Sequence, residues 1–448
     1  MSEAPAAVIL AGGKGTRLGD LTREIPKPLI EVDGRPVLFH QLDLLARSGV
    51  QEVWILSGHL GDQIAERCGD GSAWGMQIRH LREPAPLGTA GALIQLRGLI
   101  EKDFLTLSGD IMCNFDIPRL MAWHADQPEA IATVIVHPSG HMLDSDLVEI
   151  DANGRVLRLC TRPHDPQQWY HNQGIASAYV FSPRLLDYLQ PGIREEIEKH
   201  LFPRLLAAGE TLCAYSTPEY LKDMGTPARL ETVTRHMRNG WIARASLSRP
   251  RPAVFLDRDG VLNPDDGQIC SPEAFELYPQ AAEAVHLLNA AGWLAILITN
   301  QPLIAKGQLD EPGLARIHAK LETLLGQHGA WLDAIYYCPH HPHKGFEGER
   351  PEYKIDCACR KPGVGMIEAA AERFGLDRAH SYLIGDTSVD AATAAAAELS
   401  FIGVRTGHAC ADGRCETGPL RMEDDVLSAV KTILATKGDL VAGTYRDE

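Results

Sequence analysis

Short apolar runs that end in glycine or polar residues recur along the first half of the chain. Residues 6–11, 52–57 and 104–110 have the composition of buried strands, and residues 36–48 have that of a helix. The loop at residues 83–91 opens a further helix. Because strands alternate with helices, the pattern predicts an α/β fold with a mostly parallel sheet.

Apolar runs in the second half each end in a polar side chain that can take part in phosphate chemistry. The run at residues 253–256 is followed by Asp257 and Asp259, and the run at residues 382–385 by Asp386. Carboxyl ends of parallel strands meet at one sheet edge, so these carboxylates should lie close together. They would repel each other unless a cation or a proton lies between them.

The stretch at residues 236–252 separates the two halves. Its apolar periodicity fades, and Pro, Ser and Arg gather. A chain of 448 residues is too long for one ordinary core. We therefore expect two Rossmann-like domains, at 1–238 and 252–448, joined by a linker at 239–251.

Charge and composition narrow the choice of partners and compartment. The balance of 43 basic to 59 acidic residues gives a net charge of −16, which argues against nucleic acid and anionic membranes. No apolar stretch is long enough to span a membrane, and the N-terminus lacks the basic start of a signal peptide. These features predict a cytoplasmic protein and leave a homo-oligomer open. The ten cysteines are then expected to be free thiols or metal ligands.

A Cys-x-His pair followed by a Cys-x-Cys pair predicts a structural zinc site. Three thiolates and one imidazole suit a closed tetrahedral site, and the alternative is four unrelated reduced residues. The candidate ligands are Cys338, His340, Cys357 and Cys359. His341 and His343 are expected to be solvated, and Cys410 and Cys415 to be free thiols.

Two features of the first half suit a polyphosphate. Residues 12–15 form a glycine-rich turn directly after a strand, where backbone N–H groups can point at a ligand. The turn has neither the Walker spacing nor the dinucleotide spacing. Lys27 lies between two prolines, which would aim its ammonium. The alternative is a rigid surface loop with a solvated lysine.

Four motifs in order, L-A-G-G-x-G-T-R-L, P-K-P, L-G-T-A-G and S-G-D, resemble the sugar-1-phosphate nucleotidylyltransferase family over about residues 6–235. The resemblance implies transfer of a nucleotide from a nucleoside triphosphate to a sugar 1-phosphate, with Arg17 and Lys27 as catalytic cations. It also implies Mg²⁺ bound by Asp110 and Asp223. The implied nucleotide-binding residues are Leu10, Ala11, Gly12, Gly13, Gly15, Thr16, Glu83, Gly88 and Thr89. The implied sugar- and phosphate-binding residues are Arg162, Asn172 and Gly174.

Two residues bear on substrate choice within this family. Glu83 stands where many members carry glutamine, and a carboxylate can accept from both N1–H and N2–H of guanine. We therefore expect GTP to be preferred; the alternative is a plain loop carboxylate. Arg162 stands where the family often has Glu-Lys-Pro, which leaves the sugar hydroxyl contacts open.

The second half resembles the haloacid dehalogenase (HAD) phosphatase superfamily through D-R-D-G, T-N-Q, R-K-P and G-D. The resemblance implies that Asp257 attacks phosphorus and that Asp259 protonates the leaving group and then activates water. A neighbouring acid and partial burial would favour protonation of Asp259. Thr299, Asn300 and Lys361 would hold phosphoryl oxygens. Mg²⁺ would be held by Asp257, Asp386 and the backbone carbonyl of Asp259. Asp390 is either a further metal ligand or an acid at a helix N-terminus.

The zinc loop together with D-R-D-G-V-L-N and C-x-C-R-K-P-G resembles the D-glycero-D-manno-heptose 1,7-bisphosphate 7-phosphatases, a branch with a minimal cap, over about residues 252–435. This implies that zinc places Arg360 beside the phosphate. The chain departs from the group in two places. Where the group often has N-Q-S-G-I-A-R-G, this chain has Asn300-Gln-Pro-Leu-Ile-Ala-Lys306-Gly, which leaves the shape of the substrate rim open. Where the group often has Gly-Asp-Lys, this chain has Gly385-Asp386-Thr387.

The two implied reactions can follow one another, because a phosphatase acting on a sugar bisphosphate leaves a sugar 1-phosphate. The sequence therefore predicts a bifunctional enzyme of GDP-heptose synthesis. One alternative keeps both reactions on another sugar, such as mannose 1-phosphate, with a histidinol-phosphatase-like second domain. Another is a pseudo-enzyme, in which one half is a docking or regulatory module.

Overall fold

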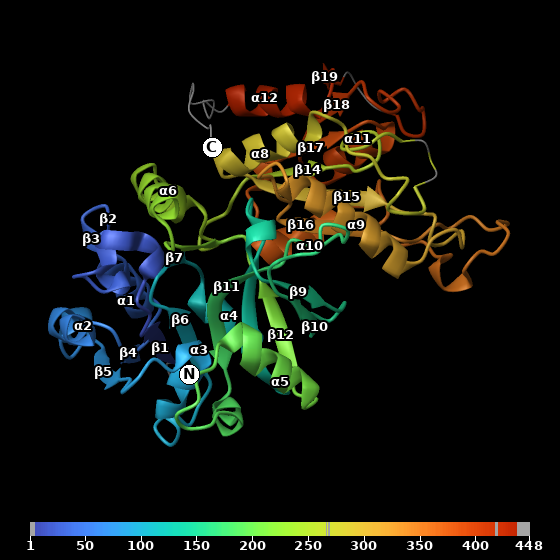
Figure 1. Cartoon of the computed structure of the whole chain (residues 1–448). Helices are drawn as coiled ribbons and strands as arrows, with labels where there is room; N and C mark the ends of the chain where they lie inside the picture. Colours follow the sequence, from blue (N-terminus) through green and yellow to red (C-terminus); the bar gives the residue numbers. More distant parts are fainter. Residues whose placement is uncertain (1–4, 266, 268, 417–419, 437–448) are drawn as a thin grey trace. The chain divides into compact units, whose positions relative to one another are not determined.

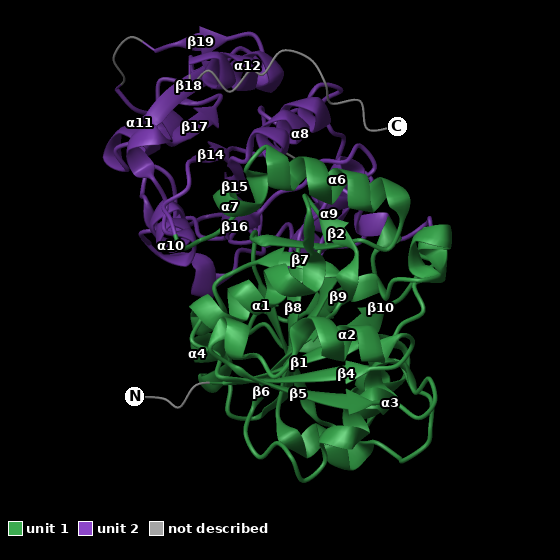
Figure 2. Cartoon of the chain, turned by 90° about the vertical axis from the view of Figure 1, so that its left-hand side faces the viewer, with its two compact units in different colours: residues 1–137, 144–164, 173–248 green, residues 138–143, 165–172, 249–448 purple. Residues whose placement is uncertain are grey.

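The computed structural model describes residues 5–265, 267, 269–416 and 420–436. These residues form two compact units, coloured separately in Figure 2. Unit 1 comprises residues 1–137, 144–164 and 173–248, and unit 2 comprises 138–143, 165–172 and 249–448. Among the described residues, no helix combines the length and the apolar character that a membrane crossing requires.

Figure 1 labels the elements of both units. The strands of unit 1 are β1 (Ala6–Ala11), β2 (Glu31–Val32), β3 (Arg35–Pro36), β4 (Glu52–Ser57), β5 (Gln77–Arg82), β6 (Phe104–Ser108), β7 (Ile111–Asn114), β8 (Ala130–His137), β9 (Leu147–Ile150), β10 (Val156–Cys160), β11 (Gly174–Phe181), β12 (Thr211–Ser216) and β13 (Tyr220–Asp223). Its α-helices are α1 (Val37–Arg47), α2 (Gly61–Cys68), α3 (Gly88–Ala92), α4 (Ile117–Ala125), α5 (Phe202–Ala207), α6 (Pro227–Arg238) and α7 (Trp241–Arg244).

The strands of unit 2 are β14 (Ala253–Leu256), β15 (Leu294–Asn300), β16 (Ala334–Cys338), β17 (Tyr382–Gly385), β18 (Ser400–Val404) and β19 (Met422–Glu423). Its α-helices are α8 (Ala281–Ala291), α9 (Glu311–Gly326), α10 (Gly365–Phe374), α11 (Ser388–Ala396) and α12 (Val426–Thr436).

The main sheet of unit 1 is mixed, which corrects the expectation of a mostly parallel sheet. Strands β6, β1, β4 and β5 lie side by side and run parallel. Strand β11 is antiparallel to β6, β8 and β9, and β10 is antiparallel to β9. Only residues 151–155 join β9 to β10, whereas a parallel crossover needs a dozen residues or more. The antiparallel pairing of β9 with β10 therefore follows from their short connection.

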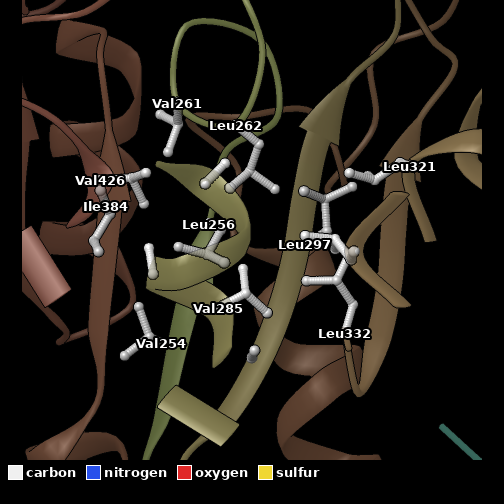
Figure 3. Packing of buried hydrophobic residues seen from close by; sticks show 14 of the residues in the cluster. Val254, Leu256, Val261, Leu262, Val285, Leu297, Leu321, Leu332, Ile384 and Val426 are labelled. Atoms are coloured by element: carbon white, nitrogen blue, oxygen red, sulfur yellow. The ribbon is translucent and has the colours of Figure 1, made fainter. Parts of the chain in front are cut away.

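The sheet of unit 2 is parallel throughout, as predicted. Its order is β16-β15-β14-β17-β18-β19, with β14 between the strands that precede Gln301 and Asp386. The apolar side chains of β14 are fully buried, and Figure 3 shows Val254 and Leu256 packed among residues of neighbouring elements. Strands buried on both faces carry continuous apolar runs, and this anchors the loop that holds Asp257 and Asp259.

The range predicted as a linker contains a short helix. Helix α7 lies within it, and Ile242 and Ala245 pack into a small buried cluster with Met224 and Val233. Residues 241–245 thus belong to the packing of unit 1.

Candidate active sites

In unit 1, Lys27 and Asp110 form a partly buried ion pair. Lys27 is only 8% exposed, so the alternative of a solvated surface lysine is wrong. It begins a short 3-10 helix directly after Pro26, whose extended backbone turns the chain inward. Asp110 follows β6, and Ser108 donates a hydrogen bond of 2.6 Å to it. The prolines on either side of Lys27 therefore aim its ammonium, as the sequence predicted.

The second predicted metal ligand of unit 1, Asp223, lies beside this pair. Strand β13 pairs with β7, and the Met224 N–H donates to the Asp110 carbonyl at 3.0 Å. Burial acts to raise the pKa of Asp223, but Arg229 and Lys27 hold that pKa below its usual value. Lys27 therefore pairs with Asp110, and its charge also acts on Asp223.

Arg229 was missed by the sequence reasoning. Its Nη1 donates to both oxygens of Asp223, at 2.8 and 2.6 Å, and its Nη2 pairs with Asp144. Arg229 lies in the first turn of α6, which Thr226 caps. A cation there opposes the helix dipole, and this is the signal that could have drawn attention to it.

Glu83 lies against the start of the glycine-rich turn. A Cβ atom on Gly12 would clash with the Glu83 carboxylate, so a larger residue there would make the Glu83 side chain move. Glu83 Oε2 accepts from the Leu87 N–H at 3.0 Å, and burial raises the pKa of Glu83. Gly15 adopts a left-handed conformation, and Arg17 reaches over Gly225, next to Asp223.

Five other predicted residues of the first site make contacts within the fold or lie in one of its strands. The Thr89 hydroxyl donates to Glu196 and accepts from the Ile197 N–H, while Gly88 lies against the Glu195 carbonyl. Arg162 binds Asp144 and Asp146 at 3.3 Å each. Both polar ends of the Asn172 amide bond the backbone of Ser139, and these two residues group with unit 2; Gly174 begins β11.

In unit 2, the predicted acids gather at the carboxyl ends of β14 and β17. Asp257, Asp386 and Asp390 each offer an oxygen within 4.8 Å of the others. Lys361 Nζ lies 2.8 Å from Asp257 and 2.6 Å from Asp390, and all these groups are buried. Burial raises the pKa of Asp257, and the Lys361 ammonium acts in the opposite direction.

Asp386 has the surroundings of a cation ligand. Its Oδ2 accepts from the His408 N–H at 2.7 Å, while its buried Oδ1 has no hydrogen-bond partner in the described part of the chain. Burial raises the pKa of Asp386 to about 6. A hard cation with oxygen ligands fits such an orphaned oxygen. Asp390 forms a capping box with Thr387 at the start of α11, as one of the two interpretations predicted.

The carboxylate of Asp259 is held by hydrogen-bond donors from two loops. Arg258 binds both its oxygens, through Nε at 3.0 Å and Nη2 at 2.9 Å. Gln301 and Asn263 each add a bond of 2.9 Å. Arg258 is itself buried, and its Nη1 contacts His318 at 3.4 Å.

The catalytic and phosphate-binding residues predicted for the second half line one cavity of about 480 Å³. Thr299 accepts from Gln301, and Asn300 bonds both backbone groups of Lys361, which fixes that lysine in place. The predicted residues on its wall are Asp257, Asp259, Thr299, Asn300, Arg360, Lys361 and Asp386. His341, expected to be solvated, also lines the cavity.

The four predicted zinc ligands converge. Cys359 Sγ lies 3.2 Å from Cys338 Sγ, 3.3 Å from Cys357 Sγ and 3.4 Å from His340 Nδ1. Ligands at Zn–S distances of about 2.3 Å around a tetrahedral ion would be separated by about 3.7 Å. The cluster therefore has the donors and nearly the spacing of a structural metal site. All ten cysteines are free of disulfides, as predicted.

Comparisons with known proteins match a different family to each half of the chain. Residues 6–240 match the nucleotidyl transferase family, and residues 358–431 match the HAD-hydrolase-like family. The chain belongs to the nucleotidyl transferase family through its first half and to the HAD-like phosphatases through its second.

Particular relatives are known for each half. A mannose-1-phosphate guanylyltransferase of Mycobacterium tuberculosis is 33% identical over 223 residues, which is 49% of this chain; the match spans 61% of that relative's length. A D-glycero-beta-D-manno-heptose-1,7-bisphosphate 7-phosphatase of Salmonella typhi is 37% identical over 36% of this chain and 84% of the relative. A crystal structure of a D,D-heptose 1,7-bisphosphate phosphatase from B. bronchiseptica, with magnesium and phosphate, is 34% identical over 41% of this chain and 99% of that one, with a TM-score of 0.37.

Proposed function

We propose that the chain catalyses two consecutive steps of nucleotide-sugar synthesis. The second domain removes the C7 phosphate of D-glycero-D-manno-heptose 1,7-bisphosphate. The first then transfers GMP from GTP to the heptose 1-phosphate and releases pyrophosphate. The observation that carries the proposal is the joining, in one chain, of the Lys27–Asp110–Asp223 cluster to the Lys361–Asp257–Asp386 cluster. We place the domains at 1–238 and 252–448, with helix α7 of the intervening stretch packed on the first domain.

In the phosphatase reaction, an oxygen of Asp257 attacks phosphorus, and the bond from phosphorus to the C7 oxygen breaks. Asp259 donates its proton to that leaving oxygen. Water then attacks the aspartyl phosphate, Asp259 takes a proton from it, and the bond from phosphorus to Asp257 breaks. Lys361 lowers the repulsion between the Asp257 carboxylate and the phosphate dianion.

In the transfer reaction, a phosphate oxygen of the sugar attacks the α-phosphorus of GTP, and the α–β bridge breaks. Both partners are polyanions, so charge must be neutralised before they meet. Lys27 and Arg17 supply the positive charge that neutralises the phosphates. Arg162 and Arg229 are placed to meet the sugar phosphate, since both contact Asp144 beside Asp223.

The acid clusters fit Mg²⁺, and the sulfur cluster fits Zn²⁺. Asp110 and Asp223 would hold one Mg²⁺; Asp257, Asp386 and the Asp259 carbonyl would hold another. Bound Mg²⁺ would supply further neutralisation of phosphate charge. Zn²⁺ on the Cys/His cluster would fix the loop that carries Arg360, whose Nη1 donates to the His340 carbonyl at 3.0 Å.

A zinc measurement tests that assignment. Purified protein should contain about one zinc per chain, and Cys357→Ser should lower both the zinc content and the melting temperature, the latter by at least about 5 °C. Elemental analysis and calorimetry give the two values. Cys410→Ser is the matched control, because its thiol lies outside the cluster. Full zinc content in Cys357→Ser would refute the assignment.

Glu83 allows a sharp test of base preference. In the wild type, kcat/KM for GTP should exceed the values for ATP, UTP and CTP. Glu83→Gln should reduce the GTP value by about 10- to 100-fold, since one bidentate base contact discriminates by about 1–3 kcal/mol. Glu66→Gln, at an exposed position of α2, should change nothing. Equal turnover of ATP and GTP by the wild type would rule out this role.

A second candidate sugar is mannose 1-phosphate, which the name of the mycobacterial relative favours. The test is direct competition. Heptose 1-phosphate and mannose 1-phosphate are supplied together with GTP, and the two GDP-sugars are separated by chromatography. The proposal expects GDP-heptose to dominate, and a majority of GDP-mannose would replace heptose by mannose in the first reaction.

A further inference from the structure

A buried arginine connects the proton-transfer acid of the second half to a buried histidine. Arg258 is only 1% exposed, and its guanidinium meets both oxygens of Asp259, through Nε at 3.0 Å and Nη2 at 2.9 Å. Such a paired contact fixes the plane of a carboxylate. The remaining branch of the guanidinium, Nη1, reaches Nε2 of His318 at 3.4 Å, 60 positions further along the chain.

We infer that His318 is a positioning residue for the phosphatase reaction: it accepts a hydrogen bond from Arg258 and so fixes the guanidinium that orients Asp259. Arg258 lines the cavity, whereas His318 lies behind it and is only 4% exposed. His318 therefore acts through Arg258. The inference rests on the proposed phosphatase function and deepens it, since it names a residue that holds the proton-transfer group in place.

The chemistry of the two groups sets the direction of the bond between them. Arginine carries only donors, so His318 must accept, and a histidine ring nitrogen accepts only in the neutral imidazole. Burial lowers the pKa of His318, and the charges of Arg258 and His171 add to that effect. The imidazole therefore stays neutral, and Nε2 keeps the lone pair that Arg258 needs.

His318 is held in place by its surroundings. It lies within α9, and Leu314 and Leu321, one turn before and after it on the same face, are fully buried in the core of unit 2. Figure 3 shows Leu321 in that core. The His318 ring lies near the ring of Tyr337 on β16, with the ring centres 6.0 Å apart. A side chain fixed by a helix and by core packing can hold its partner precisely.

Asp259 needs this precision because it acts twice in the proposed reaction. It gives a proton to the leaving oxygen and later takes one from water, and each transfer requires a carboxylate oxygen within hydrogen-bond reach. Asn263 donates to Oδ1 and Gln301 to Oδ2, at 2.9 Å each. Of these three donors, only Arg258 spans both oxygens. Loss of the support behind Arg258 would therefore let the carboxylate turn.

The test measures phosphate release from heptose 1,7-bisphosphate by the full-length chain. His318→Leu removes the acceptor, and His318→Asn keeps a polar group that is too short to reach Arg258. Both should lower kcat by about 10- to 100-fold, since a misplacement of about 1 Å can cost about 10²-fold. KM should stay within about twofold, because Asp259 moves protons rather than binding phosphate. His318→Gln, which keeps an acceptor at a similar reach, should stay within about threefold of the wild type.

A double-mutant cycle separates positioning from general packing. Arg258→Gln should itself lower kcat, and His318→Leu added to it should cause less than about a twofold further loss, because its route to Asp259 is already gone. Asn289→Leu on α8 is the matched control. It removes two buried hydrogen bonds with the Trp331 backbone, of 3.0 and 2.9 Å, so it should lower the melting temperature and keep kcat.

Wild-type kcat in both His318→Leu and His318→Asn would overturn the inference, and so would a loss that arises through KM. Equal losses in His318→Gln and His318→Leu, or losses that multiply in the double variant, would also overturn it. Each of these results leaves the proposed phosphatase intact. Release of no phosphate by the wild type would overturn the proposed function, and the role of His318 with it.

Discussion

Asp257→Asn should reduce phosphate release from the bisphosphate by at least about 10⁴-fold and leave nucleotidyl transfer to a sugar 1-phosphate unchanged. The amide cannot attack phosphorus, and loss of a covalent nucleophile costs rate enhancements of this order. The substitution keeps the shape of the side chain. Lys361 keeps its bond of 2.6 Å to Asp390, so the buried ammonium stays paired and the fold should persist.

The measurement is phosphate release and pyrophosphate release from the same preparation, each with its own substrate. Asp424→Asn, an exposed aspartate outside the cavity, should retain both rates. Phosphatase activity within tenfold of the wild type in Asp257→Asn would mean that another group is the nucleophile. Loss of both activities, with an unchanged melting temperature, would mean that Asp257 also serves the transfer reaction.

Lys27→Ala should reduce nucleotidyl transfer by about 10³-fold and leave the phosphatase at its wild-type rate. Lys27 is the buried cation where Asp110 and Asp223 converge, and removal of one preorganised charge at a polyphosphate typically costs about 10²–10³ in kcat. The two acids then lose the cation between them, although Arg229 stays on Asp223.

Pyrophosphate release with saturating GTP and sugar 1-phosphate checks this prediction. Lys27→Met, which keeps the apolar stem, separates loss of charge from loss of packing and should be as inactive as Lys27→Ala. Lys102→Ala, at an exposed position, is the control. Transfer by Lys27→Met at the wild-type rate would remove Lys27 from the chemistry.

Much of the second half could be predicted from the chain because the decisive signals are local. Apolar runs defined β14 and β17, and their ends brought Asp257 and Asp386 together as expected. The Cys-x-His and Cys-x-Cys spacings likewise predicted the sulfur cluster. In each case a local pattern marks the residues, and the parallel pairing of β14 with β17 brings the distant Asp257 and Asp386 together.

Other features depend on pairings between distant segments, which no local pattern encodes. The antiparallel strands β8, β9 and β11 follow from how connections fold back rather than from apolar runs. The sequence alone does not distinguish Arg229 and Arg258 from other charged residues. Only the structure shows that they bind Asp223 and Asp259, respectively. The donors that hold Asp259 likewise come from two segments, since Arg258 and Asn263 follow β14 and Gln301 follows β15.

Two reactions should follow one another on this one chain, and ³¹P NMR of the full-length protein tests this most directly. With heptose 1,7-bisphosphate, GTP and Mg²⁺, inorganic phosphate should appear first, followed by pyrophosphate and GDP-heptose. Asp257→Asn should form none of these three products from the bisphosphate. When heptose 1-phosphate is added, pyrophosphate should then appear at the wild-type rate. Pyrophosphate formed from the bisphosphate without prior release of phosphate would contradict the account.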